Sequence, residues 1–233
     1  MNKCIVTYAA GEHCKLLEIA LPTFKRFADK HGYDFLVGDK QCDRPPAWNK
    51  IPLLATALKA YESVLWFDAD LVIVDDSEDI PAVPPEYSHA MVRHFESGSE
   101  VPNSGMWFLR PACLPLLESL WSLEVFMNHG WWEQAALLTL MGYTVPPEGS
   151  DFRKTKCRCV WPTTWRDKVQ FLPLEWNAHP NCRGEVSRIV HCSYKDMEQR
   201  IEVMRELVNN PGYNYPERKT EEKSDSHEDE TQS

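Results

Sequence analysis

The stretch SVLWFDADLVIVDD (residues 63–76) places two carboxylates inside a run of residues that otherwise favours burial. Val64–Phe67 and Leu71–Val74 consist of β-branched, aromatic and leucine residues, which is typical of strands covered on both faces. Asp68 and Asp70 lie in the break between these two runs. An ionised carboxylate at such a place is rarely buried without a compensating positive charge. The stretch therefore predicts a buried strand that ends at a charged site.

A divalent cation is the compensating charge that suits Asp68 and Asp70 best. Hard cations such as Mg²⁺ and Mn²⁺ take one or two protein carboxylates and fill their other positions with water and substrate phosphates. The Asp-x-Asp pattern also occurs in turns, where an aspartate bonds its own backbone, so the pattern alone leaves both interpretations open. Its position at the carboxyl end of a predicted strand, where open α/β sheets bind ligands, favours a metal–diphosphate site.

The composition of the chain bounds its organisation. It has 233 residues, of which 43% are hydrophobic, and we expect a single domain with one substantial core over residues 1–215. Part of the formal net charge of -10 comes from residues 216–233, an acidic tail that is poor in hydrophobic residues and is expected to be disordered. No basic patch indicates nucleic acid as a partner.

Neither a signal peptide nor a transmembrane segment is expected. The apolar run at the amino terminus is too short for a signal peptide, and no stretch of about 18 apolar residues is present. The eight cysteines are scattered through a chain that has enough core without them, so we expect free thiols. These features predict a cytoplasmic protein.

The opening of the chain predicts a strand, a helix and a second strand. The first strand covers residues 3–8 and ends in the small residues 9–11, which let a ligand approach the backbone. Apolar residues recur at helical spacing over residues 16–28, and residues 33–37 form the second strand. This order is typical of a βαβ unit.

A second amphipathic helix is predicted over residues 51–61, directly before the Asp-x-Asp strand. Lys50 lies near its start, where a lysine is usually solvated and a phosphate contact is the alternative. The alternation of strands and helices predicts an α/β fold with a mostly parallel, Rossmann-like sheet flanked by helices.

The second half of the chain is predicted to add further elements and a long loop region. Residues 146–180 are rich in proline, tryptophan and polar residues with little periodicity, which indicates a long loop region that lines a site. The remaining elements are strands at residues 88–93, 106–109 and 186–191 and helices at residues 114–123, 133–140 and 197–207.

Two polar motifs in this half leave two interpretations each. Asn103-Ser104-Gly105 is a glycine-containing bend that either offers amide groups to a sugar or simply turns the chain. Glu133 and Gln134 begin a helix, where the helix dipole favours an acidic residue without any catalytic role. The tryptophan pair at residues 131–132 offers flat faces of the kind that carbohydrate sites use, although burial in a core is the commoner fate of an indole.

Taken in order, these motifs resemble those of the nucleotide-sugar glycosyltransferases of the GT-A fold. The resemblance covers about residues 3–208 and is closest to the galactosyl-, xylosyl- and mannosyltransferase-like group with a Trp-hydrophobic-Asp-x-Asp strand. The motifs that carry it are Tyr8-Ala9-Ala10-Gly11, Trp48-Asn49-Lys50-Ile51, Trp66-Phe67-Asp68-Ala69-Asp70, Asn103-Ser104-Gly105, Glu133-Gln134 and Val190-His191.

The resemblance implies a single GT-A-like domain and a role for each motif. Asp70 is implied as the main metal ligand, Asp68 as a ribose or metal ligand, and His191 as the residue that completes the coordination of Mn²⁺ or Mg²⁺. Glu133, where the family usually has aspartate, and Gln134 are implied as catalytic. The implied contacts to the donor are Tyr8, Ala9, Ala10, Gly11, Lys50, Asp68, Asn103, Gly105 and Lys195.

The activity implied is transfer of a sugar from a UDP- or GDP-linked donor to an acceptor hydroxyl, with retention of anomeric configuration. Sugar-nucleotide pyrophosphorylases share the fold but need a basic, glycine-rich loop near the amino terminus, whereas residues 8–12 contain one glycine and no lysine or arginine. The alternative is a non-catalytic protein that binds a carbohydrate or a nucleotide sugar on the same fold.

Overall fold

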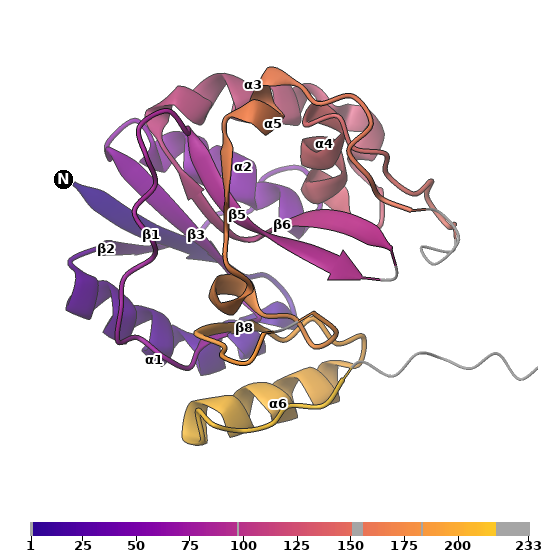
Figure 1. The fold of residues 1–233 in the computed structure, drawn as a ribbon. Helices are drawn as coiled ribbons and strands as arrows, with labels where there is room; N and C mark the ends of the chain where they lie inside the picture. Colours follow the sequence, from indigo (N-terminus) through magenta and orange to yellow (C-terminus); the bar gives the residue numbers. More distant parts are fainter. Residues whose placement is uncertain (1, 97, 151–155, 183, 218–233) are drawn as a thin grey trace, which may run out of the picture.

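The computed structural model describes residues 2–96, 98–150, 156–182 and 184–217, so the predicted acidic tail falls outside it except for residues 216 and 217. Helices cover both faces of a central sheet (Figure 1). The elements of the first half are β1 (Lys3–Tyr8), α1 (His13–His31), β2 (Asp34–Val37), the 3-10 helix η1 (Pro46–Asn49), α2 (Lys50–Ala57), β3 (Ser63–Asp68) and β4 (Leu71–Ile73).

The second half contributes β-strands at the centre and at one edge of the sheet. Its elements are β5 (His89–Glu96), β6 (Ser99–Leu109), η2 (Pro111–Cys113), α3 (Leu114–Ser122), η3 (Glu124–Phe126), α4 (Trp132–Leu140), α5 (Thr164–Asp167), β7 (Val169–Leu172), η4 (Leu174–Asn177), β8 (Ile189–His191) and α6 (Met197–Asn209). None of the helices in the described part of the chain is long and apolar enough to cross a lipid bilayer.

The central sheet has the strand order β2-β1-β3-β6-β5-β7. Strands β1, β2 and β3 are mutually parallel, and β5 pairs in parallel with β7. Among the described strands of this sheet, β6 alone runs the other way, antiparallel to both β3 and β5. The predicted mostly parallel sheet is therefore confirmed. A second, two-stranded antiparallel sheet joins β4 to β8.

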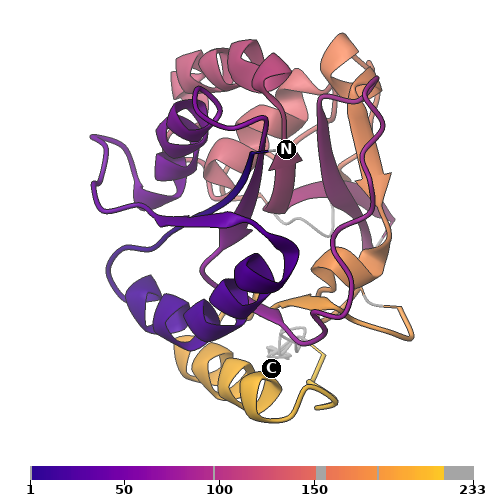
Figure 2. The same ribbon diagram turned by 90° about the vertical axis from the view of Figure 1, so that its left-hand side faces the viewer.

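Two hydrophobic cores lie on opposite faces of the central sheet. Successive residues of β3 alternate between them: Leu65 and Phe67 belong to one core, whereas Val64 and Trp66 belong to the other. This alternation is the two-residue period of a strand that is buried on both faces. Helices α1 and α6 cover the first face, and α2, α3 and α4 cover the second (Figure 1, Figure 2).

Two sequence predictions about loops are corrected. Asn103–Gly105 is not a bend ahead of a strand, because it lies inside β6 at a bulge where Met91 pairs with Trp107 and Val92 pairs with Asn103. The predicted loop region at residues 146–180 contains β7, which extends the sheet beside β5. A strand of 4 residues is too short to show periodicity among prolines and polar residues.

All eight cysteines are free thiols, as predicted. Burial raises the pKa of Cys4 and of Cys157 to about 12 each. A thiol with so high a pKa carries almost no thiolate at neutral pH, so these two side chains act as small apolar core residues.

Candidate active site

A cavity of about 440 Å³ opens at the carboxyl ends of β1 and β3, where Tyr8 and Asp68 are the last strand residues. Its size is within the range of small-molecule sites, about 300–1,000 Å³. The residues around it come from six regions far apart in the sequence, and they are Tyr8, Ala9, Ala10, His13, Pro45, Pro46, Ala47, Lys50, Trp66, Asp68, Ala69, Asp70, Asn103, Ser104, Gly130, Trp131, Trp132, Glu133, Gln134, His191 and Arg200.

Lys50 is buried at the centre of one group of side chains, which we call the Lys50 cluster: Lys50, Asp68, Ser104 and Glu133. Its Nζ lies 2.7 Å from Glu133 Oε1 and 3.0 Å from Asp68 Oδ1. It also donates to both the carbonyl oxygen and Oγ of Ser104, at 3.2 Å each. With four oxygen contacts, the lysine is not solvated as a lysine at a helix start usually is.

Burial and charge oppose each other in this cluster. Burial alone would lower the pKa of Lys50, but the carboxylates of Asp68 and Glu133 outweigh it and raise that pKa. Burial raises the pKa of the Glu133 carboxyl, against the lowering effect of the Lys50 ammonium. The cluster is thus a buried charge network in which one cation compensates two carboxylates.

The bulge in β6 explains how Ser104 reaches this cluster. The backbone N–H of Ser104 donates to Gln134 Oε1 at 3.1 Å, at the first turn of α4. Asn103 Oδ1 accepts hydrogen bonds from Gly105 N at 2.9 Å and from Asn177 Nδ2 at 2.8 Å. Side chains of α4 and η4 therefore stabilise the bulge, and the bulge in turn points Ser104 at Lys50.

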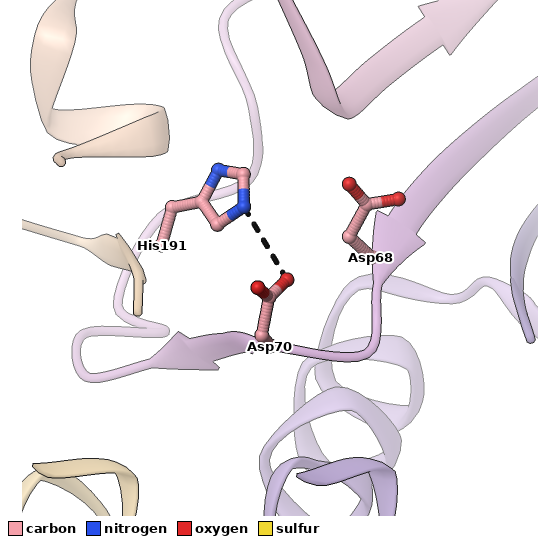
Figure 3. Close-up of side chains that lie close together, drawn as sticks. All are labelled: Asp68, Asp70 and His191. Carbon is pink, nitrogen blue, oxygen red and sulfur yellow. Dashed lines mark ion pairs between the residues drawn. The ribbon is translucent and has the colours of Figure 1, made fainter. Parts of the chain in front are cut away.

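A second group, the Asp70 cluster, consists of Asp70, His191 and Arg200. Asp70 directly precedes β4, and its Oδ1 lies 3.3 Å from Nε2 of His191 at the end of β8 (Figure 3). Its Oδ2 lies 3.2 Å from Nη1 of Arg200, which comes from α6. Burial would raise the pKa of Asp70, but His191 and Arg200 outweigh burial and hold that pKa well below its usual range.

Asp68, Asp70 and His191 together fit a divalent cation. One ligand atom from each lies within 4.8 Å of the other two, and the two carboxylates face the imidazole across a common space (Figure 3). Two oxygens and one nitrogen suit Mn²⁺, and the set leaves positions open for water and phosphate. His191 directs Nε2 toward Asp70, so Nε2 is the nitrogen available to a cation.

Gly105 makes room for the ring of His191. A Cβ at this position would lie 2.6 Å from Cε1 and 2.9 Å from Nδ1 of His191, closer than atoms can approach without a shift. Gly105 does not itself border the cavity. The glycine predicted as a donor contact therefore lies where it allows the histidine to take its position.

Most of the side chains singled out from the sequence border one cavity. The exceptions are Gly11, Gly105 and Lys195, which do not line it, whereas the other ten do. Those ten are Tyr8, Ala9, Ala10, Lys50, Asp68, Asp70, Asn103, Glu133, Gln134 and His191.

Sequence reasoning missed Arg200, the cation that lies opposite Asp70. Its Nε donates to the carbonyl of Tyr194 at 3.0 Å, which fixes the guanidinium beside the cavity. A signal was available, because Arg200 shares its face of α6 with the buried Met204 and Leu207 at helical spacing. An arginine on the buried face of a helix indicates a carboxylate partner or an anionic ligand.

Solved structures with this fold were found, whereas no protein-family model and no curated protein sequence matches the chain. A glycosyltransferase involved in the glycosylation of the major capsid of PBCV-1 aligns with a TM-score of 0.65 at 16% identity, over 88% of this chain and 99% of that one. The glycosyltransferase GlyE of Streptococcus pneumoniae TIGR4 aligns with a TM-score of 0.57 at 13% identity, over 89% of this chain and 60% of that one.

The galactosyltransferase LgtC, in complex with donor and acceptor sugar analogues, aligns with a TM-score of 0.55 at 10% identity, over 88% of this chain and 95% of that one. The TM-scores show a common fold, and at identities this low the likeness is limited to the fold. The chain therefore has the GT-A fold of nucleotide-sugar glycosyltransferases, as the sequence motifs predicted.

Proposed function

We propose that this protein is a metal-dependent glycosyltransferase that transfers a hexose or pentose from a UDP- or GDP-linked donor to an acceptor hydroxyl, with retention of anomeric configuration. One observation carries the proposal: Asp68, Asp70 and His191 border the same cavity as Glu133 and Gln134, on a GT-A fold. Fold alone does not establish activity, so the proposal depends on this set of side chains. The cytoplasmic location expected from the sequence is part of the same proposal.

Asp68, Asp70 and His191 would hold the divalent cation, Mn²⁺ or Mg²⁺. Bound there, it would supply Lewis-acid stabilisation for the negative charge on the departing diphosphate. Arg200 extends the positive surface of the cavity beside Asp70 and would donate to diphosphate oxygens, the role that Lys195 was expected to fill.

The small residues after β1 would receive the nucleoside. Ala9 and Ala10 border the cavity next to Tyr8, so the backbone is accessible there without large side chains in the way. The amide of Asn103 borders the same cavity from the bulge of β6 and would contact the sugar.

Glu133 would stabilise the positive charge that develops at the anomeric carbon. Lys50 and the hydroxyl of Ser104 both donate to its Oε1, at 2.7 and 3.3 Å, so the carboxylate is already fixed before a substrate arrives. Preorganised charge of this kind lowers a barrier without reorganisation during the reaction. Gln134 is held in the same way by Ser104 N.

The pairing of the carboxylates supports retention. Each carboxylate among the described side chains around the cavity has a cationic partner: Asp68 and Glu133 share Lys50, and Asp70 contacts Arg200. An inverting enzyme needs a general base within hydrogen-bond reach of the acceptor hydroxyl. A carboxylate oxygen that already accepts from a cationic side chain is less available to an acceptor hydroxyl, which favours a mechanism without a general base.

Calorimetry with UDP- and GDP-sugars, with and without Mn²⁺, tests the proposal. We expect binding of one nucleotide class that requires Mn²⁺, and we expect product NMR to show the anomeric configuration of the donor. Lys195→Ala is a suitable control because Lys195 does not border the cavity. Binding of free saccharides without any response to nucleotide or metal would favour the non-catalytic alternative.

A further inference from the structure

Two chemically different groups of residues line the cavity. One group comprises the Asp70 cluster and His13. The other group comprises Pro45 and Pro46, which lead into η1, and the tryptophan pair at residues 131–132 where α4 begins. Glu133 and Gln134 directly follow that pair in the sequence and border the same cavity. The apolar group therefore shares the cavity with the side chains that we place at the reacting carbon.

Trp132 is far more exposed than the indoles that form the cores of the protein. Trp48, Trp107 and Trp176 are at most 1% exposed, whereas Trp132 is 43% exposed and borders the cavity. An exposed indole loses the hydrophobic stabilisation that a buried one gains. Packing of the core therefore does not explain this side chain.

The backbone at Trp132 is in a conformation that bulky residues rarely adopt. Its φ is 42°, and among the described residues it is the one non-glycine residue with a positive φ. Such a conformation is unfavourable for a residue with a large side chain, and it persists only where surrounding contacts impose it.

His129 supplies those contacts. Its buried ring accepts a hydrogen bond at Nδ1 from Trp131 N, at 3.0 Å, while its Nε2 lies 2.9 Å from the carbonyl oxygen of Pro146. Because Nδ1 accepts, Nε2 carries the proton that is donated to Pro146. The carbonyl of His129 accepts from Trp132 N at 2.8 Å. The turn before Trp132 is thus fixed by two hydrogen bonds, one to the ring of His129 and one to its backbone carbonyl.

We propose that Trp132 is the platform on which the acceptor binds, and that the acceptor is a carbohydrate whose apolar ring face stacks on the indole. This inference rests on the proposed function and adds the substrate class of its second site. A pyranose ring has an apolar C–H face that matches an indole face, whereas the hydroxyl of a serine or threonine in a peptide has none.

The position of the platform suits the group transfer. Trp132, Glu133 and Gln134 all border the cavity, so a sugar stacked on the indole would occupy the same space as the side chains that we place at the reacting carbon. In the transfer, the acceptor oxygen bonds the anomeric carbon while the bond from that carbon to the diphosphate oxygen breaks. The proton of the acceptor hydroxyl leaves with the diphosphate.

The test compares Trp132→Ala and Trp132→Phe with Trp161→Ala, a control at an indole that is 74% exposed and does not border the cavity. Methyl glycosides and disaccharides are compared as acceptors with a serine- and threonine-containing peptide. We expect Trp132→Ala to raise the saccharide KM about tenfold and to lower the ratio of transfer to donor hydrolysis, because a ring-stacking contact is lost. Trp132→Phe should retain most of the affinity, and Trp161→Ala all of it. An unchanged saccharide KM in Trp132→Ala, or transfer to the peptide alone, would overturn the proposal that the acceptor stacks on Trp132.

Saccharide binding measured without donor separates this inference from the proposed function. If the wild-type protein binds no sugar nucleotide, the proposed function fails, yet saccharide binding that Trp132→Ala abolishes would still support the platform. Absence of saccharide binding by the wild-type protein would overturn it.

Trp132→Gly removes the indole and tolerates the positive φ, so we expect it to melt no lower than wild type while losing saccharide binding. A lower melting temperature with unchanged saccharide binding would show that the indole serves the fold instead.

Discussion

The Lys50 cluster and the Asp70 cluster border the same cavity but differ in how completely their charges are paired. Lys50 Nζ has four oxygen contacts between 2.7 and 3.2 Å, and the side chain of Lys50 is 4% exposed. Asp70 has longer contacts of 3.2 and 3.3 Å to Arg200 and His191. The Nδ1 atom of His191 is buried without a hydrogen-bond partner among the described residues.

This difference indicates that the Lys50 cluster fixes its neighbouring side chains in place, whereas the Asp70 cluster can bind a ligand. The Lys50 cluster has no remaining capacity for a ligand at its ammonium, so it fixes Glu133, Ser104 and Asp68 in place. The Asp70 cluster holds its carboxylate and imidazole at a distance that a cation fits between, with an arginine beside them. Removal of Lys50 should therefore damage the fold, whereas removal of Asp70 should damage the chemistry.

The largest effect is expected for Lys50→Met. The substitution leaves the carboxylates of Asp68 and Glu133 without their cation, so the free energy of unfolding should fall by about 3–5 kcal/mol, the scale for breaking a buried ion pair. Urea unfolding measures it. The double variant Lys50→Met, Glu133→Met removes both charges of the buried pair and should regain much of the loss. A loss below about 1 kcal/mol, the scale of surface pairs, would contradict the supporting role.

Asp70→Asn should lower turnover by about 10²–10³-fold at saturating donor and Mn²⁺, because a preorganised charge is lost while the shape is kept. The urea midpoint should change much less than in Lys50→Met. Asp75→Asn is the matched control, since Asp75 lies beyond β4, pairs with Arg188 at 2.6 Å and does not border the cavity. Equal losses of turnover in the two variants would refute the distinction between the clusters.

His191→Ala should reduce Mn²⁺-dependent turnover by about one to two orders of magnitude, and excess Mn²⁺ should restore part of it, because one of three protein ligands is lost. A Mn²⁺ titration of initial rates gives the apparent affinity. His179→Ala is the control: its ring centroid lies 6.3 Å from that of His191, yet it does not border the cavity. If both variants shift the titration alike, His191 acts through packing and not as a ligand.

The smallest effect is expected for Gly105→Ala, about tenfold in apparent Mn²⁺ affinity, because the new methyl group displaces the His191 ring without removing it. Gly212→Ala, whose Cβ would meet its nearest atom at 3.6 Å, should leave the affinity unchanged. An unaltered Mn²⁺ titration in Gly105→Ala would mean that the ring of His191 does not need its present position.

The sequence allowed prediction of those parts of the fold and site that depend on local pattern. The continuous apolar run at residues 64–67 predicted β3 and the charged break after it, and helical spacing predicted α1. The bulge of β6 was not predictable in this way. It depends on hydrogen bonds from Ser104 to Gln134 and from Asn177 to Asn103, which join residues far apart in the chain. Polar residues and a glycine therefore resembled a turn.

Arg200 was missed for a related reason. Its partner Asp70 is 130 positions away, and no short motif contains both residues. His191 could be singled out because it closes an apolar strand within a known order of motifs. The place of Arg200 on the buried face of α6 indicates that it has a partner, but it does not indicate which residue that partner is. Contacts between distant segments are set by packing, which one sequence does not display.

The pairing of β4 with β8 also determines when this site forms during synthesis. The carbonyl of Asp70 accepts a hydrogen bond from Cys192 N at 2.8 Å, and Leu71 pairs with His191, so Asp70 gains these neighbours only after residue 192 has left the ribosome. Closing so long a loop is slow relative to pairing nearby strands. A nascent chain that has emerged only as far as β7 holds neither His191 nor Arg200 opposite Asp70. The proposed metal site thus stays incomplete on the ribosome until β8 pairs with β4 and α6 docks, whatever the state of the central sheet.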